Sequence, residues 1–360
     1  MNANRQSRIE DEPLAALLNQ ATELLRIHPG QTFLWVADEH PLPSSQLAML
    51  ANENMHFISN RFDQVQLAQQ QGLNSFFSDM DFDLLPTSSF DGVFFRIAKE
   101  RKLSHRVINE AFRVLTPTGT LWISGYKNQG IKTYIDHTKR TFNTRADVER
   151  GDRQRMLAKI EAVQPKIGVS LDDNDYPNLR QHTIANTTFW TKPGLYGWDK
   201  IDQGSALLVE WLHATPERIQ HKTVLDLGCG YGYLSLFCAH MNAESIVATD
   251  NCAAAIAACK KNLAAVNTPT TVIADDAATS ITTKFDVIVC NPPFHQGFTT
   301  TPKLHSTFLK AISARLSPQG KAYLVINQFL SLQKEATKVG LQLQEQKTEL
   351  GFTLLEASFR

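Results

Sequence analysis

Two short motifs bring together residue types that bind ligands and orient reacting groups, and the first is Asp226–Gly232 (DLGCGYG). It ends a predicted strand and opens a predicted helix, where glycines permit a tight turn and a close approach of the backbone to a ligand. A dinucleotide fingerprint would require glycine at position 233, which is Tyr233, and Asp226 would repel a pyrophosphate. The acid instead favours a cationic ligand, such as the amino group of a methionine moiety.

The second motif is Asn291–Phe294 (NPPF), directly after the predicted strand 285–290. The two prolines remove backbone donors and stiffen the loop. The side-chain oxygen of Asn291 and the carbonyl of Pro292 can together hold a planar exocyclic NH2 with its lone pair facing a methyl donor. Phe294 offers a face for stacking a base. The candidate catalytic residues are therefore Asn291, Pro292 and Phe294, and the candidate substrate contacts beside them are Pro293 and Phe294.

Acidic residues follow the two strands after the glycine motif. Asp250 can accept hydrogen bonds from ribose hydroxyls; capping the next helix is its alternative role, for which Asn251 competes. Of Asp275 and Asp276, one can bind the amine of an adenine, and we select Asp276; turn formation is the alternative. The candidate cofactor-binding residues are Asp226, Gly228, Gly230, Gly232, Asp250, Asp276 and Asn291.

The elements that position these motifs alternate between strand and helix. Alternation of this kind predicts a parallel sheet with helices on both faces, an α/β fold. The predicted strands are 223–227, 245–249, 271–274, 285–290 and 321–326, and the predicted helices are 233–241, 253–266 and 305–316. The tail, 341–360, predicts an antiparallel edge hairpin around Leu350-Gly351.

The N-terminal half repeats this plan, with predicted strands at 32–37, 56–59 and 90–95. Residues 115–119 (LTPTG) precede a strand as 316–320 (LSPQG) do. We therefore predict two tandem doubly wound Rossmann-like domains related by duplication, although any two doubly wound domains look alike. The predicted boundaries are 1–125 for the first domain, 126–184 for a basic linker with a helical stretch near 147–163, and 185–360 for the catalytic domain.

The N-terminal copy lacks both motifs. Residues 96–99 (RIAK) replace the NPPF tetrapeptide, and no glycine loop follows residues 35–39. This domain is therefore expected to bind neither the cofactor nor the target amine. A cluster of basic residues suits phosphate contacts with RNA, with a solvated helical face as the alternative. The predicted contacts are Arg96, Lys99 and Lys102, within a cluster that includes Arg101 and Arg106.

Composition narrows the class of protein without naming a partner. Lys plus Arg and Asp plus Glu each number 36, and 42% of residues are hydrophobic, as in a soluble globular protein. The 5 cysteines form no C-x-x-C pair, so no metal site is expected, and their scatter fits a reducing compartment. No apolar run approaches the length of a membrane span. We predict a cytoplasmic protein with no membrane contact.

The motifs together resemble a known family. DLGCGYG with NPPF is similar to class I S-adenosylmethionine-dependent methyltransferases that act on planar amino groups. NPPF followed by His295, with a degenerate N-terminal copy, resembles the ribosomal RNA guanine-N2 methyltransferases, first the small-subunit 16S enzymes called C members and second the large-subunit 23S enzymes called G members. The resemblance spans 189–360 and includes 202–205 (DQGS). Extra residues between Phe189 and Asp202 depart from the family pattern.

The resemblance implies S-adenosyl-L-methionine as cofactor and the N2 amine of a guanine in 16S ribosomal RNA as methyl acceptor. The implied partner is the small ribosomal subunit, and a monomer is favoured. Alternatives are the same reaction on 23S RNA, methylation of a release-factor glutamine or a DNA adenine, and a non-catalytic ribosome-assembly factor. Glutamine enzymes usually carry Tyr at the position of Phe294, and adenine enzymes usually carry a different recognition domain. Binding of S-adenosylmethionine distinguishes the assembly factor from the enzymes.

Overall fold

The computed structural model describes residues 11–163, 168–184, 187–292 and 302–360. The candidate residues Pro293 and Phe294, with His295, lie outside the described residues. The chain divides into two compact units, Met1–Pro177 and Asn178–Arg360. In the described ranges no helix is long and apolar enough to cross a membrane.

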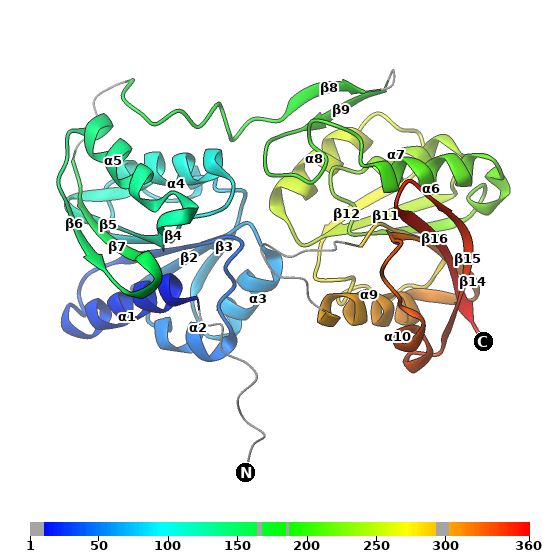
Figure 1. The fold of residues 1–360 in the computed structure, drawn as a ribbon, viewed down its shortest axis with the longest axis horizontal. Helices are drawn as coiled ribbons and strands as arrows, with labels where there is room; N and C mark the ends of the chain where they lie inside the picture. Colours follow the sequence, from blue (N-terminus) through cyan, green and yellow to red (C-terminus); the bar gives the residue numbers. More distant parts are fainter. Residues whose placement is uncertain (1–10, 164–167, 185–186, 293–301) are drawn as a thin grey trace, which may run out of the picture. The chain divides into compact units, whose positions relative to one another are not determined.

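The first unit is built on a 7-stranded sheet of five parallel strands followed by an antiparallel pair, in the order β3-β2-β1-β4-β5-β7-β6. Helices α4 and α5 cover one face of it, and α1, α2 and α3 cover the other (Figure 1). The strands are β1 (Phe33–Ala37), β2 (Met55–Ser59), β3 (Asn74–Phe77), β4 (Phe90–Arg96), β5 (Leu115–Tyr126), β6 (Ala146–Arg150) and β7 (Arg155–Glu161). The helices are α1 (Glu12–Ile27), α2 (Ser44–Leu50), α3 (Phe62–Gln70), α4 (Arg101–Val114) and α5 (Ile131–Phe142), with 3-10 turns at Phe82–Leu84, Lys127–Gln129 and Asp152–Gln154.

The second unit repeats the same order, β12-β11-β10-β13-β14-β16-β15, with an antiparallel hairpin at its edge. Helices α6, α7 and α8 cover one face, and α9 and α10 cover the other (Figure 1). Its strands are β10 (Thr223–Leu227), β11 (Ser245–Asp250), β12 (Thr270–Ala274), β13 (Phe285–Cys290), β14 (Leu316–Asn327), β15 (Leu341–Glu349) and β16 (Phe352–Phe359), with a separate ribbon of β8 (Arg180–Ile184) and β9 (Thr187–Thr191). Its helices are α6 (Gln203–His213), α7 (Tyr233–His240), α8 (Ala253–Leu263), α9 (Pro302–Arg315) and α10 (Gln333–Lys338), with a 3-10 turn at Pro216–Arg218.

This confirms the predicted fold class, and the two sheets agree in detail as well as in order. The pairing of β4 with β5 is irregular just after the first residue of β4, and β13 with β14 is irregular at the same place. Asp91 Oδ2 accepts a hydrogen bond from Thr32 N at 2.9 Å, and Asp286 Oδ2 accepts one from Thr223 N at 3.1 Å. A shared bulge and a shared long-range bond support duplication over chance similarity of two doubly wound domains.

The matching LTPTG and LSPQG segments each need their glycine. A Cβ atom at Gly119 would lie 2.9 Å from the carbonyl oxygen of Phe90, and one at Gly320 would lie 2.9 Å from that of Asp286. Backbone oxygens cannot move aside as a flexible side chain can. The close approach of the fifth strand to its neighbour therefore requires glycine in both units.

The prediction of a linker over 126–184 with a helix near 147–163 is wrong. Residues 146–150 and 155–161 form the strands β6 and β7, and β7 pairs with β5 along seven residues from Thr120↔Glu161 to Tyr126↔Arg155. The helix of this stretch is α5, Ile131–Phe142, which ends before the predicted position. Pairing with β5 decides the conformation of this segment, because strand preference depends on the neighbouring strand.

Candidate active site

The carboxyl ends of three parallel strands bring the predicted motifs to one edge of the second sheet. Leu227 on β10 pairs with Thr249 on β11, and Asp226 pairs with Val289 on β13. The glycine loop, Asp250 and Asn291 therefore each leave a neighbouring strand at the same edge. This is the switch point at which open α/β sheets bind ligands.

The three glycines of the loop have distinct roles. All have positive φ, +79° at Gly228, +55° at Gly230 and +87° at Gly232. A Cβ at Gly232 would lie 2.8 Å from the Cys259 sulfur, so this glycine lets α7 begin against α8. A Cβ at Gly230 would meet nothing within 4 Å. Gly230 thus faces open space, as a ligand-binding backbone requires.

Asp250 ties the loop to the next helix. Its Oδ2 accepts a hydrogen bond from Gly230 N at 2.9 Å, and its Oδ1 accepts one from Cys252 N at 2.8 Å. Helix α8 is preceded by Cys252, which makes no side-chain cap. Asp250 is half-buried, and each oxygen keeps a lone pair after these bonds. Its contact with the ribose stays a prediction.

Asp226 lies beneath the loop and is 0% exposed. Its Oδ2 accepts hydrogen bonds from Ser235 N at 2.9 Å and from the Ser235 hydroxyl at 2.6 Å. Its Oδ1 has no partner among the described residues. Burial raises the pKa of this carboxyl to about 7, against the lowering effect of Ser235. A buried acceptor without a donor is costly, so this oxygen marks a place where a bound cation or a bridging water would be stabilising.

The structure separates the two acids after β12. Asp275 is 1% exposed, and its oxygens accept from the hydroxyls of Thr279 and Ser280 at 2.9 and 2.7 Å. It therefore shapes the turn. Asp276 is half-buried and remains the candidate for the adenine amine.

Asn291 is held by two residues that the sequence reasoning did not assign to it. Its Nδ2 donates to Asp202 Oδ1 at 2.7 Å and to the Ser205 hydroxyl at 2.8 Å. A carboxylate only accepts, so the amide nitrogen must face Asp202. Asp202 Oδ1 also accepts from Ser205 N at 2.8 Å, capping α6. The amide oxygen of Asn291 is consequently left to accept from a ligand.

Known proteins are similar in sequence to the region that carries these residues. Residues 186–356 match the family described as the methyltransferase small domain. The matched residues include the glycine loop, Asp250 and Asn291. The chain is 26% identical to the ribosomal RNA small subunit methyltransferase C of Pseudoalteromonas atlantica over 83% of this chain and 87% of the relative. It is 34% identical to the protein of the same name from Actinobacillus succinogenes over 44% and 47%.

A solved structure shares the arrangement of both units. It is a T. Thermophilus 16S rRNA N2 methyltransferase in complex with AdoMet and guanosine, with a TM-score of 0.78 and 24% identity, covering 95% of this chain and 92% of that one. The likeness shows the fold: two tandem methyltransferase-like units, of which the second carries the motifs. The cofactor of that protein is AdoMet.

The residues of the methyltransferase domain fit that cofactor. The open face at Gly230 leaves room against the backbone, and the unpartnered Oδ1 of Asp226 lacks the donor that a methionine ammonium supplies directly or through one water. The sulfonium of the cofactor supplies the electrophilic methyl group when it is bound. A hydrogen bond with Cys259 and burial raise the pKa of the Cys229 thiol, and burial raises the pKa of the Cys290 thiol, so both favour the protonated form.

We predict that cofactor affinity rises with pH up to about 7. With its pKa raised to about 7, Asp226 is protonated below that pH in the free protein. A cationic amino group favours the ionised carboxyl, so binding must release a proton below pH 7, weakening affinity by up to about tenfold per pH unit. Calorimetric titration from pH 5.5 to 7.5 measures this, with Asp226→Asn as the control that abolishes the slope. If the cofactor affinity did not change across this pH range, Asp226 would not contact the ammonium group.

In the first unit, the position equivalent to Asn291 is taken by Arg96, and its predicted phosphate contact is wrong. Arg96 is 3% exposed. Its guanidinium bonds both oxygens of Asp11, at 3.1 and 3.2 Å, and donates to Gln129 Oε1 at 2.7 Å. Burial alone would raise the pKa of Asp11, but His40 and Arg96 hold it well below its usual range. A buried, paired arginine stabilises the fold and cannot contact RNA.

Two further members of the predicted basic cluster are also paired. Lys102 Nζ lies 2.6 Å from Asp172 Oδ2, and Arg106 lies 2.9 Å from Glu110. Lys99 is exposed, and its backbone N–H donates to a Glu39 carboxylate oxygen. Nearby, Asn60 donates to Asp38 Oδ1 at 2.7 Å between the ends of β2 and β1. In the first unit, side chains thus occupy the sheet edge that corresponds to the edge with the cofactor motifs in the second unit.

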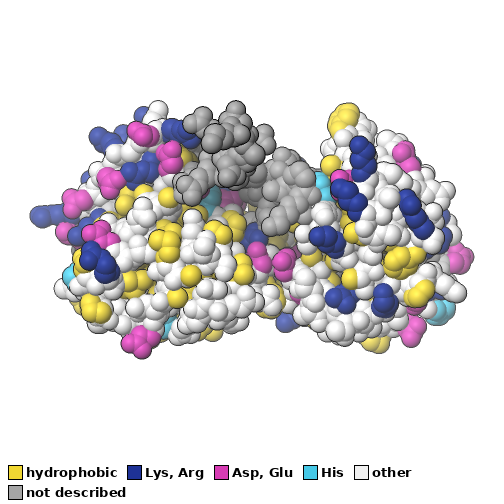
Figure 2. All heavy atoms as spheres, turned by 90° about the horizontal axis from the view of Figure 1, so that it is seen from below, with side chains coloured by type: hydrophobic (Ala, Val, Ile, Leu, Met, Phe, Trp, Pro, Cys, Tyr) yellow, Lys and Arg dark blue, Asp and Glu magenta, His cyan; other side chains and the backbone are white. Residues whose placement is uncertain are grey.

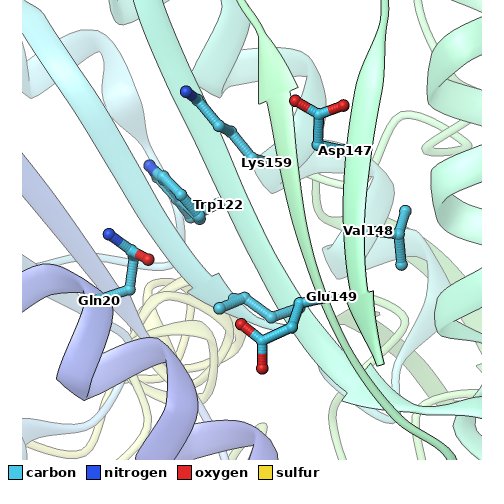
Figure 3. A pocket seen from close by; sticks show the side chains of 7 residues that line it. Gln20, Trp122, Asp147, Val148, Glu149 and Lys159 are labelled. Carbon is cyan, nitrogen blue, oxygen red and sulfur yellow. The ribbon is translucent and has the colours of Figure 1, made fainter. Parts of the chain in front are cut away.

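A pocket of about 330 Å³ opens elsewhere on the first unit, between α1 and the strands β5, β7 and β6 (Figure 3). Lys159 lies over the ring of Trp122, 5.9 Å from its centroid, and Asp147 is the cross-strand neighbour of Lys159. The lining residues are Gln20, Trp122, Asp147, Val148, Glu149, Leu157 and Lys159. None belongs to the predicted site, and their mixed charges indicate no phosphate or cofactor recognition.

Proposed function

We propose that this chain transfers a methyl group from S-adenosylmethionine to the exocyclic N2 amine of a guanine in 16S ribosomal RNA. The relatives that match over most of both chains carry the small-subunit methyltransferase name. The observation that carries the chemistry is the fixed amide of Asn291, which presents an oxygen acceptor at the edge beside the glycine loop.

An exocyclic NH2 offers two donors and one weakly nucleophilic nitrogen. The oxygen of Asn291 accepts one hydrogen, and we assign the second to the carbonyl of Pro292, which accepts no backbone hydrogen bond from the described residues. Both hydrogen bonds raise the electron density on the nitrogen and orient its lone pair toward the methyl group. The methylated amine then loses its proton to water, so no general base is required.

The RNA partner needs cationic surface. Lys99 and Arg101 of the predicted cluster are exposed, and further exposed cations lie outside that cluster. Four of them form the α5 cluster: Lys132, Lys139, Arg140 and Arg145. Among the described residues none of these four forms an ion pair with a carboxylate. On the second unit, Figure 2 looks onto the side covered by α9 and α10, where lysine and arginine side chains are spread, Lys310, Lys334 and Lys338 among the exposed ones. Both units therefore offer phosphate contacts.

Neutralising part of the α5 cluster is expected to weaken RNA binding. In the variant Lys139→Gln, Arg140→Gln, Arg145→Gln, the slope of log affinity against log salt should fall by about 0.7–0.9 per lost phosphate contact. Filter binding to 16S RNA at several salt concentrations measures it. Arg26→Gln, at the end of α1 on the opposite face of the same sheet, is the matched control. An unchanged slope in the triple variant would exclude this surface as an RNA contact.

The reaction itself is tested with purified protein, labelled S-adenosylmethionine, and either naked 16S RNA, assembled small subunits or 23S RNA. Mass mapping should find N2-methylguanine in 16S RNA, and the comparison of naked RNA with subunits identifies the working substrate. Methylation of 23S RNA alone would favour the large-subunit alternative. Failure to bind S-adenosylmethionine would favour the non-catalytic assembly factor.

A further inference from the structure

Two aromatic side chains of the methyltransferase domain are exposed to solvent. Tyr196 is 73% exposed and Phe329 is 88% exposed, and no other aromatic side chain among the described residues is classed as exposed. Leu350, at 65%, is a third exposed apolar side chain of this unit. Exposed apolar side chains that gather on one surface mark interaction sites, whereas single ones are ordinary.

Phe329 is presented by an ordered turn at the carboxyl end of β14. Its backbone N–H donates to Asn327 Oδ1 at 3.0 Å, and Leu330 N donates to Asn327 O at 2.9 Å. Gln328 N donates to Gly351 O at 2.9 Å, which joins this turn to the tip of the β15–β16 hairpin. Phe329 and Leu350 therefore flank one hydrogen bond. Because the backbone is already fixed, a ligand that covers the ring orders little additional chain.

This turn is connected to the catalytic amide by contacts within the same unit. Asn327 pairs across the sheet with Phe352. The Phe352 ring packs so tightly on the start of α6 that a Cβ at Gly204 would lie 2.9 Å from it. The next residue, Ser205, accepts the hydrogen bond from Asn291. The turn that carries Phe329 is thus linked through Phe352 to the start of α6, which holds Asn291.

Tyr196 is anchored to the same centre from the loop before α6. Its hydroxyl donates to Asp202 Oδ2 at 2.8 Å, and the other oxygen of Asp202 accepts from Asn291 Nδ2 at 2.7 Å. The hydroxyl is used internally, so the ring offers its apolar face outward. Contacts within this unit consequently link both Tyr196 and the turn of Phe329 to the candidate catalytic residue Asn291.

We propose that Tyr196 and Phe329 form a stacking platform for unpaired nucleotides that flank the target base. The proposal rests on the proposed function, because it takes RNA as the substrate. Uncharged aromatic faces cannot bind phosphate, but they stack any nucleobase. A duplex keeps its bases stacked inside, so this platform selects single-stranded or flipped-out segments. The cations described above hold the backbone, and these rings add a preference for unpaired bases.

The experiment compares Phe329→Ala, Phe329→Trp and Tyr196→Ala with the parent in the full chain. Phe329→Ala should weaken binding to single-stranded oligoadenylate and to 16S RNA by about 5- to 100-fold, the scale of one lost base stack. Phe329→Trp should bind like the parent. S-adenosylmethionine affinity and thermal unfolding should not change in either Phe329 variant. Met49→Ala, an exposed apolar side chain of the first unit, is the matched control.

The outcomes separate this proposal from the proposed function. Parental affinity of Phe329→Ala for both RNAs, or an equal loss for duplex RNA, would overturn the platform even if the parent methylates 16S RNA. A selective loss for single-stranded RNA would support the platform even if no methylation of 16S RNA were found. Loss of a protein partner with RNA binding intact would assign the rings to a protein interface instead. Because Tyr196 contacts Asp202, its variant should lower turnover as well as affinity, whereas Phe329→Ala should act on affinity alone.

Discussion

Replacing Asn291 by alanine should lower the rate of methyl transfer by about 10²-fold or more, the scale of one well-placed hydrogen-bonding group in an active site. The alanine variant keeps the glycine loop and Asp250 unchanged, so cofactor affinity should stay near that of the parent. Single-turnover kinetics with enzyme in excess isolates this step from product release. Normal turnover would exclude Asn291 as the acceptor of the target amine.

The contacts of Asn291 provide graded controls. Ser205→Ala removes one of two acceptors for the Asn291 amide, and Asp202 still orients it, so the rate should fall less, by about tenfold, the scale of one ordinary hydrogen bond. Asn291→Asp places a carboxylate 2.7 Å from that of Asp202 and should be as inactive as alanine. A Ser205→Ala variant slower than Asn291→Ala would mean that Ser205 contacts substrate itself.

Much of the catalytic edge was predictable because its motifs are local. Glycines with positive φ and prolines after a strand are requirements of the backbone, and they leave a signature in consecutive residues. The hydrogen bonds that orient Asn291 leave no such signature in consecutive residues. Asp202 and Ser205 lie 89 and 86 residues earlier in the chain, and only the packing of α6 against β14 brings them to β13. The DQGS segment was noted, but its role depends on tertiary contacts.

The first unit shows where local reasoning fails. A run of basic residues has the same composition whether each faces solvent or a carboxylate. Arg96 meets Asp11 across 85 residues of sequence, and Lys102 meets Asp172 across 70. Those partners bury Arg96 in an ion pair and occupy Lys102 in a salt bridge at the surface. The exposed cations of α5 lay in the stretch interpreted as a linker, so the error in the strands β6 and β7 also displaced the RNA surface.

Replacing Arg96 by methionine should destabilise the first unit by about 3–5 kcal/mol, because it leaves the partly buried carboxylate of Asp11 without its cation. Asp11 also caps α1 by accepting from Leu14 N at 2.8 Å, so it cannot simply turn away. In the parent, the Arg96–Asp11 ion pair should stabilise the fold less in acid. Because the pKa of Asp11 is lowered in the folded protein, the stabilisation is fully present above the usual pKa of an aspartate and is lost as the pH falls below it. Chemical denaturation at pH 7 and at a pH below the usual pKa of an aspartate measures both effects.

A second substitution separates a structural role from an RNA contact. Asp11→Asn keeps an oxygen for the α1 cap and removes the charge, so the double variant Arg96→Met, Asp11→Asn should regain part of the stability lost in Arg96→Met. Below its unfolding temperature, Arg96→Met should bind 16S RNA with the salt dependence of the parent, unlike the triple variant in the α5 cluster. If Arg96→Met kept its stability and lost a phosphate contact, Arg96 would have to face solvent in the RNA-bound protein. The sheet edge of the first unit at the end of β4 would then bind RNA, because the Arg96–Asp11 ion pair would open to accept a phosphate.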